Sequence, residues 1–432
     1  MRTAPRHLGI LMLLCACVPM VTTAAPVPPP KAEAPNSDFR AIIGGTIQYA
    51  HSDIWTHTLA STGPLVPMAG EVVRGQRLDL VISFGGFAVD RDGQGDVVYD
   101  LTVARPDGAT RVVGTNLVAF HGTVPALHMM HVTAESAYLI FEKEDPAGTY
   151  RFIAKLKDRI GHTEVEVSGE VNVLDREAEK PLPADFDLKK MSEWLMHYYE
   201  HPEPRLALPV LRFAAHDRFM AAHPGAWPAL LGTYEMILRD NPWLAAQFQA
   251  RLLAIETDKA EQDRLLYVLA YVFRANSAFG QFLPPHMRED FRADQQQRWP
   301  DPDQELFTGS QLDVMWGRFF GTGAFAPIQG LVSALEYHKY HGSIEAFKKL
   351  DPKPAVAPPE VQREAIYRAA VWSLKANAIQ HKLVYDYLAY LMNDSKTGSD
   401  NAPQIAVIIG AKIKMSDGKV IDPNNPPASG AH

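Results

Sequence analysis

The amino-acid sequence predicts a multidomain β + α protein, in which an N-terminal antiparallel β-sandwich precedes an all-α region. Apolar residues alternate with polar ones over about 38–174, which is the period of a half-buried strand. Over 187–414 they recur every three to four residues, the period of an amphipathic helix. A charged, proline-containing segment at 175–186 separates the two patterns and is expected to be a linker. The length of 432 residues suits two or three domains.

The segment 1–24 has the layout of a secretory signal peptide. Two arginines form a short basic region, an apolar run follows at 8–18, and small residues at 22–25 offer a cleavage site. The apolar run is shorter than the about 20 residues needed to cross a bilayer. We therefore expect an exported, periplasmic protein whose mature chain begins with a proline-rich spacer at 25–37.

A second interpretation of the same segment is a lipid anchor. The sequence Leu14-Cys15-Ala16-Cys17 resembles a bacterial lipobox, and Cys17 would then be the lipidated first residue. The chain has only these two cysteines, so a chain cleaved after residue 24 has no thiol. It would form no disulfide and offer no thiolate to a metal or a substrate.

The charge balance bears on the class of partner. The formal net charge is −8 and no basic run occurs, whereas nucleic-acid binding needs clustered lysine and arginine. No segment after the first 24 residues is both long and apolar enough to span a membrane. We expect no nucleic-acid partner and no transmembrane helix, and the partner is a protein or envelope component of unknown identity.

The strands of the predicted sandwich are short and punctuated by glycine, proline and aspartate, as in antiparallel sandwiches. They are expected at 77–84, 96–103, 110–113, 137–141, 148–157 and 164–173. Within 145–154, Asp145, Gly148 and Tyr150 precede the start of a strand. This segment resembles the last hairpin of immunoglobulin-like and fibronectin-type-III-like domains, in which the tyrosine ties a corner. The resemblance implies a fold and no chemistry, and the paired cysteines of immunoglobulin domains are missing.

The region 187–414 is expected to form a helical array or irregular α-solenoid, because about ten helices follow one another with short connections. Asn241-Pro242 and Asp258 with Glu261 have the pattern of helix starts, and glycines stop a helix near residue 321. The expected helices are about 187–200, 205–222, 228–239, 242–256, 258–276, 285–297, 310–321, 325–340, 359–379, 381–393 and 402–414. This region resembles uncharacterised exported bacterial proteins, which implies no activity. The tail at 415–432 is expected to be disordered.

The sequence contains no recognisable catalytic motif. It has no Gly-x-Ser-x-Gly, no His-Glu-x-x-His and no phosphate-binding loop, so we expect no catalytic residue and no cofactor.

Two clusters with metal-ligand chemistry were weighed against simpler interpretations. His121, His128 and His131 would suit copper together with two methionines, but in a strand positions 128 and 131 point to opposite faces. Acidic residues alternate at Asp90, Asp92 and Asp96 as in a calcium loop, but a hairpin turn explains them with fewer assumptions.

Histidines also pair at helical spacing. His197 and His201 are four residues apart, and His338 lies three residues before His341. Such spacing can present two imidazoles to one cation. In the first pair, however, Pro202 directly follows His201, and we expect the helix to end there. We expect no metal site at any of these positions.

One long loop, about 298–309, is the predicted binding surface. It places Trp299 between Arg298 and Pro300, where no helical face is available to bury the indole. The alternative is that Trp299 folds back as a core plug. We therefore interpret the protein as a non-catalytic exported interaction or scaffold protein of the bacterial cell envelope. The alternative is an exported hydrolase that uses scattered carboxylates on a glycan or a peptide.

Overall fold

The structure is a computed structural model of the 432-residue chain. It describes residues 39–59, 63–64, 66–124, 130–133, 136–175, 180–255, 257–274, 280, 283–295, 300–301, 303–306, 308–350, 354, 356–393, 401–411, 413–414 and 420–421. The predicted signal peptide and spacer, with Cys17, lie outside these residues, as do His128, Arg298 and Trp299.

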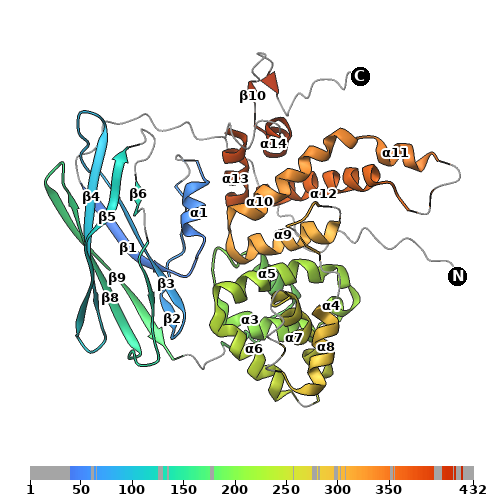
Figure 1. Ribbon diagram of the computed structural model, residues 1–432, viewed down its shortest axis with the longest axis horizontal. Helices are drawn as coiled ribbons and strands as arrows, with labels where there is room; N and C mark the ends of the chain where they lie inside the picture. Colours follow the sequence, from blue (N-terminus) through green and yellow to red (C-terminus); the bar gives the residue numbers. More distant parts are fainter. Residues whose placement is uncertain are drawn as a thin grey trace.

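The N-terminal part contains two β-sheets (Figure 1). The first pairs β3 (Arg77–Gly85) with β1 (Arg40–Thr46), β6 (His131–Val132) and β7 (Tyr138–Ile140), all antiparallel. The second has the order β2-β9-β8-β4-β5 and is strongly curled. Its strands are β2 (Glu71–Val73), β9 (Thr163–Leu174), β8 (Gly148–Asp158), β4 (Gln94–Ala104) and β5 (Thr110–Thr123). β2 is parallel to β9, unlike the all-antiparallel arrangement that we predicted.

The two sheets bury one apolar core between them. On β3 the alternate residues Leu78, Leu80, Ile82 and Phe84 belong to this core, although Asp79 and Val81 between them are buried too. On β4 and β8 buried residues largely alternate with more exposed ones. Because side chains on a strand alternate between faces, this pattern places one face of each sheet on the core. The period of two in the sequence therefore identified the strands that carry most of this core.

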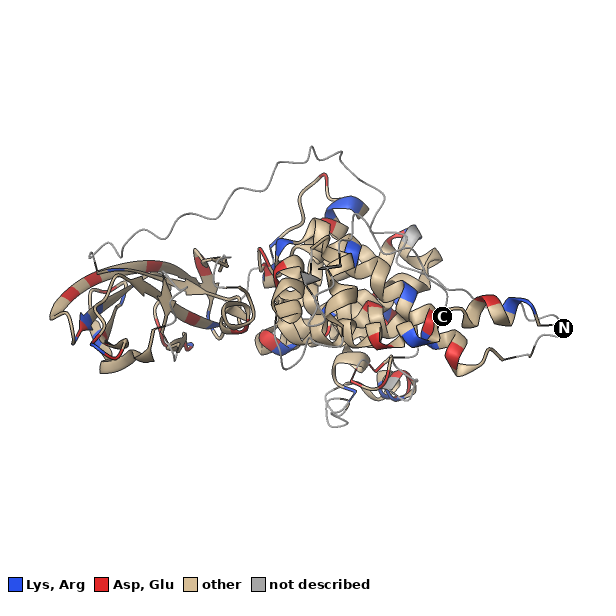
Figure 2. Ribbon diagram, turned by 90° about the horizontal axis from the view of Figure 1, so that it is seen from above, with Lys and Arg blue, Asp and Glu red and all other residues tan. Residues whose placement is uncertain are grey.

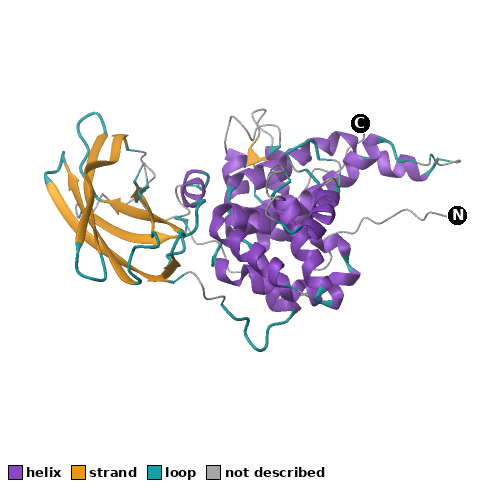
Figure 3. Ribbon diagram, turned by 60° about the horizontal axis from the view of Figure 1, so that its bottom comes forward, coloured by secondary structure: helices purple, strands orange, loops and turns teal. Residues whose placement is uncertain are grey.

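The C-terminal part is all helical apart from one short hairpin (Figure 3). Its first apolar core is formed by helices of residues 188–295. These are α2 (Leu188–Met196), α3 (Ala207–His216), α4 (Arg218–Ala222), α5 (Trp227–Asp240), α6 (Pro242–Ala254), α7 (Lys259–Val272) and α8 (Pro285–Gln295). α7 lies in the interior of this core, because Leu265, Leu266 and Val268–Tyr271 are buried.

The remaining helices form a second apolar core. They are α9 (Gly309–Thr322), α10 (Phe325–Ser333), a 3-10 helix at Ala334–Tyr340, α11 (Ser343–Lys348), α12 (Pro359–Gln380), α13 (Lys382–Asn393) and α14 (Ala402–Ile409). A two-residue hairpin, β10 (Ile413–Lys414) with β11 (Val420–Ile421), extends into the segment predicted as a tail. None of the described helices is both long and apolar enough to cross a lipid bilayer.

α9 connects the two helical cores. Thr308 and Gln311 form a capping box at its start, and Gly323 ends it with a left-handed φ of 67°. One side of α9 packs on α5 so closely that a Cβ atom on Gly317 would lie 2.0 Å from the carbonyl oxygen of Ala229. The opposite side carries Trp316 and its apolar neighbours into the second core. Glycine at this position therefore sets the distance between α5 and α9.

The sandwich contacts the helical part through α1 (His51–Thr56), a helix that the sequence did not predict. In Figure 1, α1 lies between the four-stranded sheet and α13. Ile54 is buried in the second helical core, and the His57 ring stacks on Phe325 with centroids 4.1 Å apart. The Asp53 carboxylate accepts a hydrogen bond of 2.6 Å from the backbone N–H of Phe325.

Charged residues of both signs are interspersed over both parts (Figure 2). The figure also shows the sandwich and the helical part side by side, with α1 at their junction.

Candidate functional site

The described residues of the loop singled out in the sequence line a pocket of about 590 Å³. Residues 303–306 form one wall. The opposite wall comes from the 3-10 helix and α12, with Glu336, Tyr337, Tyr340 and Arg363. The pocket has the size of a small-molecule site, and both aromatic rings and charged groups line it.

Polar contacts hold the loop and the pocket wall in place. The Gln311 side chain donates hydrogen bonds to the carbonyl oxygens of Asp301, at 2.7 Å, and Glu305, at 3.2 Å. The Glu305 carboxylate accepts a hydrogen bond of 2.9 Å from Arg363 and one of 3.3 Å from the Tyr337 hydroxyl. The Arg363 guanidinium also lies 5.4 Å from the centre of the Tyr340 ring. These contacts tie the loop to α9 and α12 before any ligand binds.

Among the described residues, the histidines and aspartates singled out in the sandwich form no group of three metal ligands. His131 is buried among the rings of Phe84, Phe87 and Phe120. His121 is exposed and lies 3.9 Å from Asp96, which also faces Arg159.

Asp90 and Asp92 lie in a tight turn. Asp90 accepts hydrogen bonds from the backbone N–H groups of Asp92 and Gln94. The turn joins β3 to β4, which belong to different sheets, so it is not the hairpin that we expected. The Asp90 carboxylate therefore accepts hydrogen bonds from the backbone of its own turn, as in other Asx turns.

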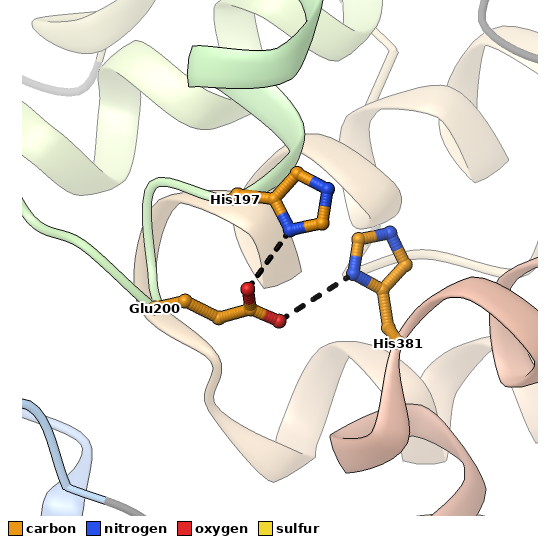
Figure 4. Close-up of side chains that lie close together, drawn as sticks. All are labelled: His197, Glu200 and His381. Atoms are coloured by element: carbon orange, nitrogen blue, oxygen red, sulfur yellow. Dashed lines mark hydrogen bonds and ion pairs between the residues drawn. The ribbon is translucent and has the colours of Figure 1, made fainter.

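A histidine–glutamate cluster joins distant parts of the helical region (Figure 4). His197 Nδ1 lies 2.9 Å from one oxygen of Glu200, and His381 Nδ1 lies 3.9 Å from the other. The Tyr199 hydroxyl donates a hydrogen bond of 2.6 Å to Glu200 and lies 3.2 Å from His381 Nδ1. His201, which lies four residues after His197, is not a member of the cluster.

The environment of the cluster shifts the titration of its members. The hydrogen bond between His197 and Glu200 raises the pKa of the His197 imidazole. Burial alone would raise the pKa of Glu200, but hydrogen bonds from His197, His381 and Tyr199 hold it well below its usual range. Burial lowers the pKa of His381 and raises that of Tyr199. Glu200 is therefore an ionised acceptor between a neutral imidazole and a neutral phenol.

A second histidine–carboxylate group, His216 with Asp258 and Glu261, has a different electrostatic setting. His216 Nε2 lies 2.6 Å from Asp258, whereas Glu261 is buried between two guanidinium groups. Arg251 lies 2.6 Å and Arg212 3.0 Å from the same Glu261 oxygen. This group is an ion-pair network that joins α3, α6 and α7.

The helical spacing considered in the sequence analysis included His197, but it could not relate His197 to His381. Tyr199 and His381 are 182 positions apart in the sequence, and no local pattern relates them. No protein-family model matches the chain, and no curated protein matches it either.

Proposed function

We propose that this protein is an exported, non-catalytic interaction protein of the bacterial cell envelope, and that its pocket at residues 303–306 binds an envelope glycan. One observation carries the proposal: the pocket combines two tyrosine rings, three carboxylates and an arginine, and the loop that forms one of its walls is already held in place. Hydroxyl-rich ligands offer many hydrogen-bond donors to carboxylates and apolar ring faces to tyrosine.

The carboxylates of the pocket favour binding over hydrolysis. Glu305 is paired with Arg363, and Asp303 lies 2.8 Å from Arg318. Both carboxylates are therefore engaged by guanidinium groups, whereas a glycosidase needs two carboxyl groups that face the scissile bond of the substrate. The alternative of an exported hydrolase rests on Glu336, the third carboxylate in the lining.

Co-sedimentation of the mature chain with purified cell-wall glycan tests the proposal. Tyr337→Ala should weaken binding about tenfold, or ~1.4 kcal/mol. Tyr385→Ala on α13 is the matched control, because Tyr385 is exposed outside the pocket. Failure of the wild-type chain to sediment, or equal affinity of the two variants, would refute the proposal. Release of new reducing ends by the wild-type chain would establish the hydrolase instead.

Export is supported by the basic and apolar pattern of residues 1–24. N-terminal sequencing of the protein from the envelope fraction should find a start near Ala25, or a lipidated Cys17. An intact Met1 on most of the protein would contradict export.

We also propose that the sandwich belongs to the immunoglobulin-like class. Two features support this: β2 runs parallel to β9 at the edge of the five-stranded sheet, and the Tyr150 hydroxyl donates a hydrogen bond of 3.0 Å to the carbonyl oxygen of Pro146. The latter is the arrangement of a tyrosine corner. Tyr150→Phe should cost about 1 kcal/mol of unfolding free energy. An unchanged stability would argue against this assignment of the corner.

A further inference from the structure

We propose that His197, Glu200 and His381 form a binding site for a zinc-type divalent metal ion. The site is separate from the proposed glycan pocket and does not depend on it. Two imidazoles and one carboxylate are a ligand set found in zinc proteins whose fourth position is left to water or substrate. The three side chains present one nitrogen or oxygen each, and all of these atoms lie within 4.8 Å of one another.

The spacing of these atoms suits a tetrahedral ion. Zinc bonds to nitrogen and oxygen of about 2.1 Å place the ligand atoms of a tetrahedron about 3.4 Å apart. The three ligand atoms, one from each residue, all lie within 4.8 Å of one another, and the Glu200 carboxylate faces both histidines, with one oxygen 2.9 Å from His197 Nδ1 and the other 3.9 Å from His381 Nδ1. An ion between them therefore requires only small movements of side chains that already face one another (Figure 4).

The surroundings orient the ligands as they do at known metal sites. The Tyr199 hydroxyl donates a hydrogen bond to Glu200 and so fixes the direction of the carboxylate. The His381 ring is fully buried against the rings of Phe319, Phe320 and Tyr199.

Electrostatics distinguish this cluster from the one at His216. The charged neighbour of His197 besides Glu200 is Glu193, which also favours a cation. At the other cluster the Glu261 carboxylate is bound by Arg212 and Arg251, whose charges oppose a cation. The His216 cluster, which also combines histidine with carboxylates, therefore serves as an internal comparison for the proposed site.

An ion at this site is reachable from solvent and connects separate elements. The side chains of His197 and Glu200 are 39% and 36% exposed, whereas that of His381 is 0% exposed. The open side leaves room for water as a further ligand. Bound zinc would tie the segment after α2 to the junction of α12 and α13, and so stabilise the folded chain against unfolding.

The test is zinc titration of the mature chain after treatment with a chelator, followed by calorimetry and by the visible spectrum of Co²⁺ as a substitute ion. We expect one ion per chain, a tetrahedral cobalt spectrum, and a loss of affinity of at least about tenfold in His197→Gln and Glu200→Gln. Both side chains are partly exposed, so circular dichroism should show that these variants fold. His216→Gln is the matched control and should bind zinc as the wild type does.

Three results would overturn the proposal. They are wild-type protein that binds no stoichiometric zinc, equal affinity of the His197 and His216 variants, or an octahedral cobalt spectrum. Because none of these measurements involves glycan, failure of the metal site leaves the glycan proposal untouched, and the reverse also holds.

Discussion

Asp313 is an acid buried in α9 with no hydrogen bond or ion pair to another described residue. Burial raises its pKa to about 7, from an ordinary value of 3.8. An Asp313→Asn substitution replaces the carboxyl group with a neutral group of nearly the same shape. The substitution therefore removes the titration and changes little else.

The sign of the effect follows from proton binding. Between pH 3.8 and about 7 the folded chain holds a proton on Asp313 that the unfolded chain has released. The free energy of unfolding therefore falls as the pH rises through this window, and is level above it. The gap of roughly three pH units, at ~1.36 kcal/mol each, corresponds to about 4 kcal/mol in full and about 3 kcal/mol between pH 5 and pH 8.

Urea unfolding followed by tryptophan fluorescence at pH 5 and pH 8 measures this difference. The Asn variant should gain about 3 kcal/mol relative to the wild type between the two pH values. Asp263→Asn on α7 is the control, because its side chain is 53% exposed and should show no such gain. If the difference between Asp313→Asn and the wild type were the same at both pH values, the inference of a buried, neutral acid would be wrong.

Two further predictions concern packing, and thermal unfolding measures both. Gly317→Ala should cost about 1–3 kcal/mol, because the new Cβ atom would overlap a backbone carbonyl of α5. Gly309→Ala is the control and should leave the stability nearly unchanged, because the added Cβ atom meets nothing within 4 Å. If the two variants had the same stability, α5 and α9 would be able to move apart freely. Ile54→Ala should cost about 2–4 kcal/mol, because it removes α1 from the second helical core. Ile42→Ala, at a residue that is 61% exposed, should cost little, and a similar small loss at Ile54 would mean that α1 does not stabilise the helical part.

The order of the two parts and most of their elements could be predicted from the sequence. The switch of period after residue 174 marks the change from strands to helices, because local period records which neighbouring side chains share a buried face. The apolar stripe of α9 at Leu312, Met315, Trp316, Phe319 and Phe320 is buried in the second core, as its spacing predicts. The start of α9 at Thr308 and its stop near Gly323 depend on contacts within a few residues.

The tertiary structure decided what these local patterns could not. The sequence pattern from 51 to 56 is too short to stand out, and α1 is defined by the helical core that buries Ile54. The helical spacing in the sequence relates His197 to His201, whereas the fold brings His197 to Glu200 and to His381. That pairing depends on how the end of α2 packs against the α12–α13 junction. Tyr199, just after the end of α2, and His381 are 182 positions apart, and no local pattern spans such a separation. The sequence by itself therefore determined the type and order of the elements, because these follow from neighbours along the chain. The tertiary structure alone decided which ligand-type side chains meet, because that follows from the packing of distant helices.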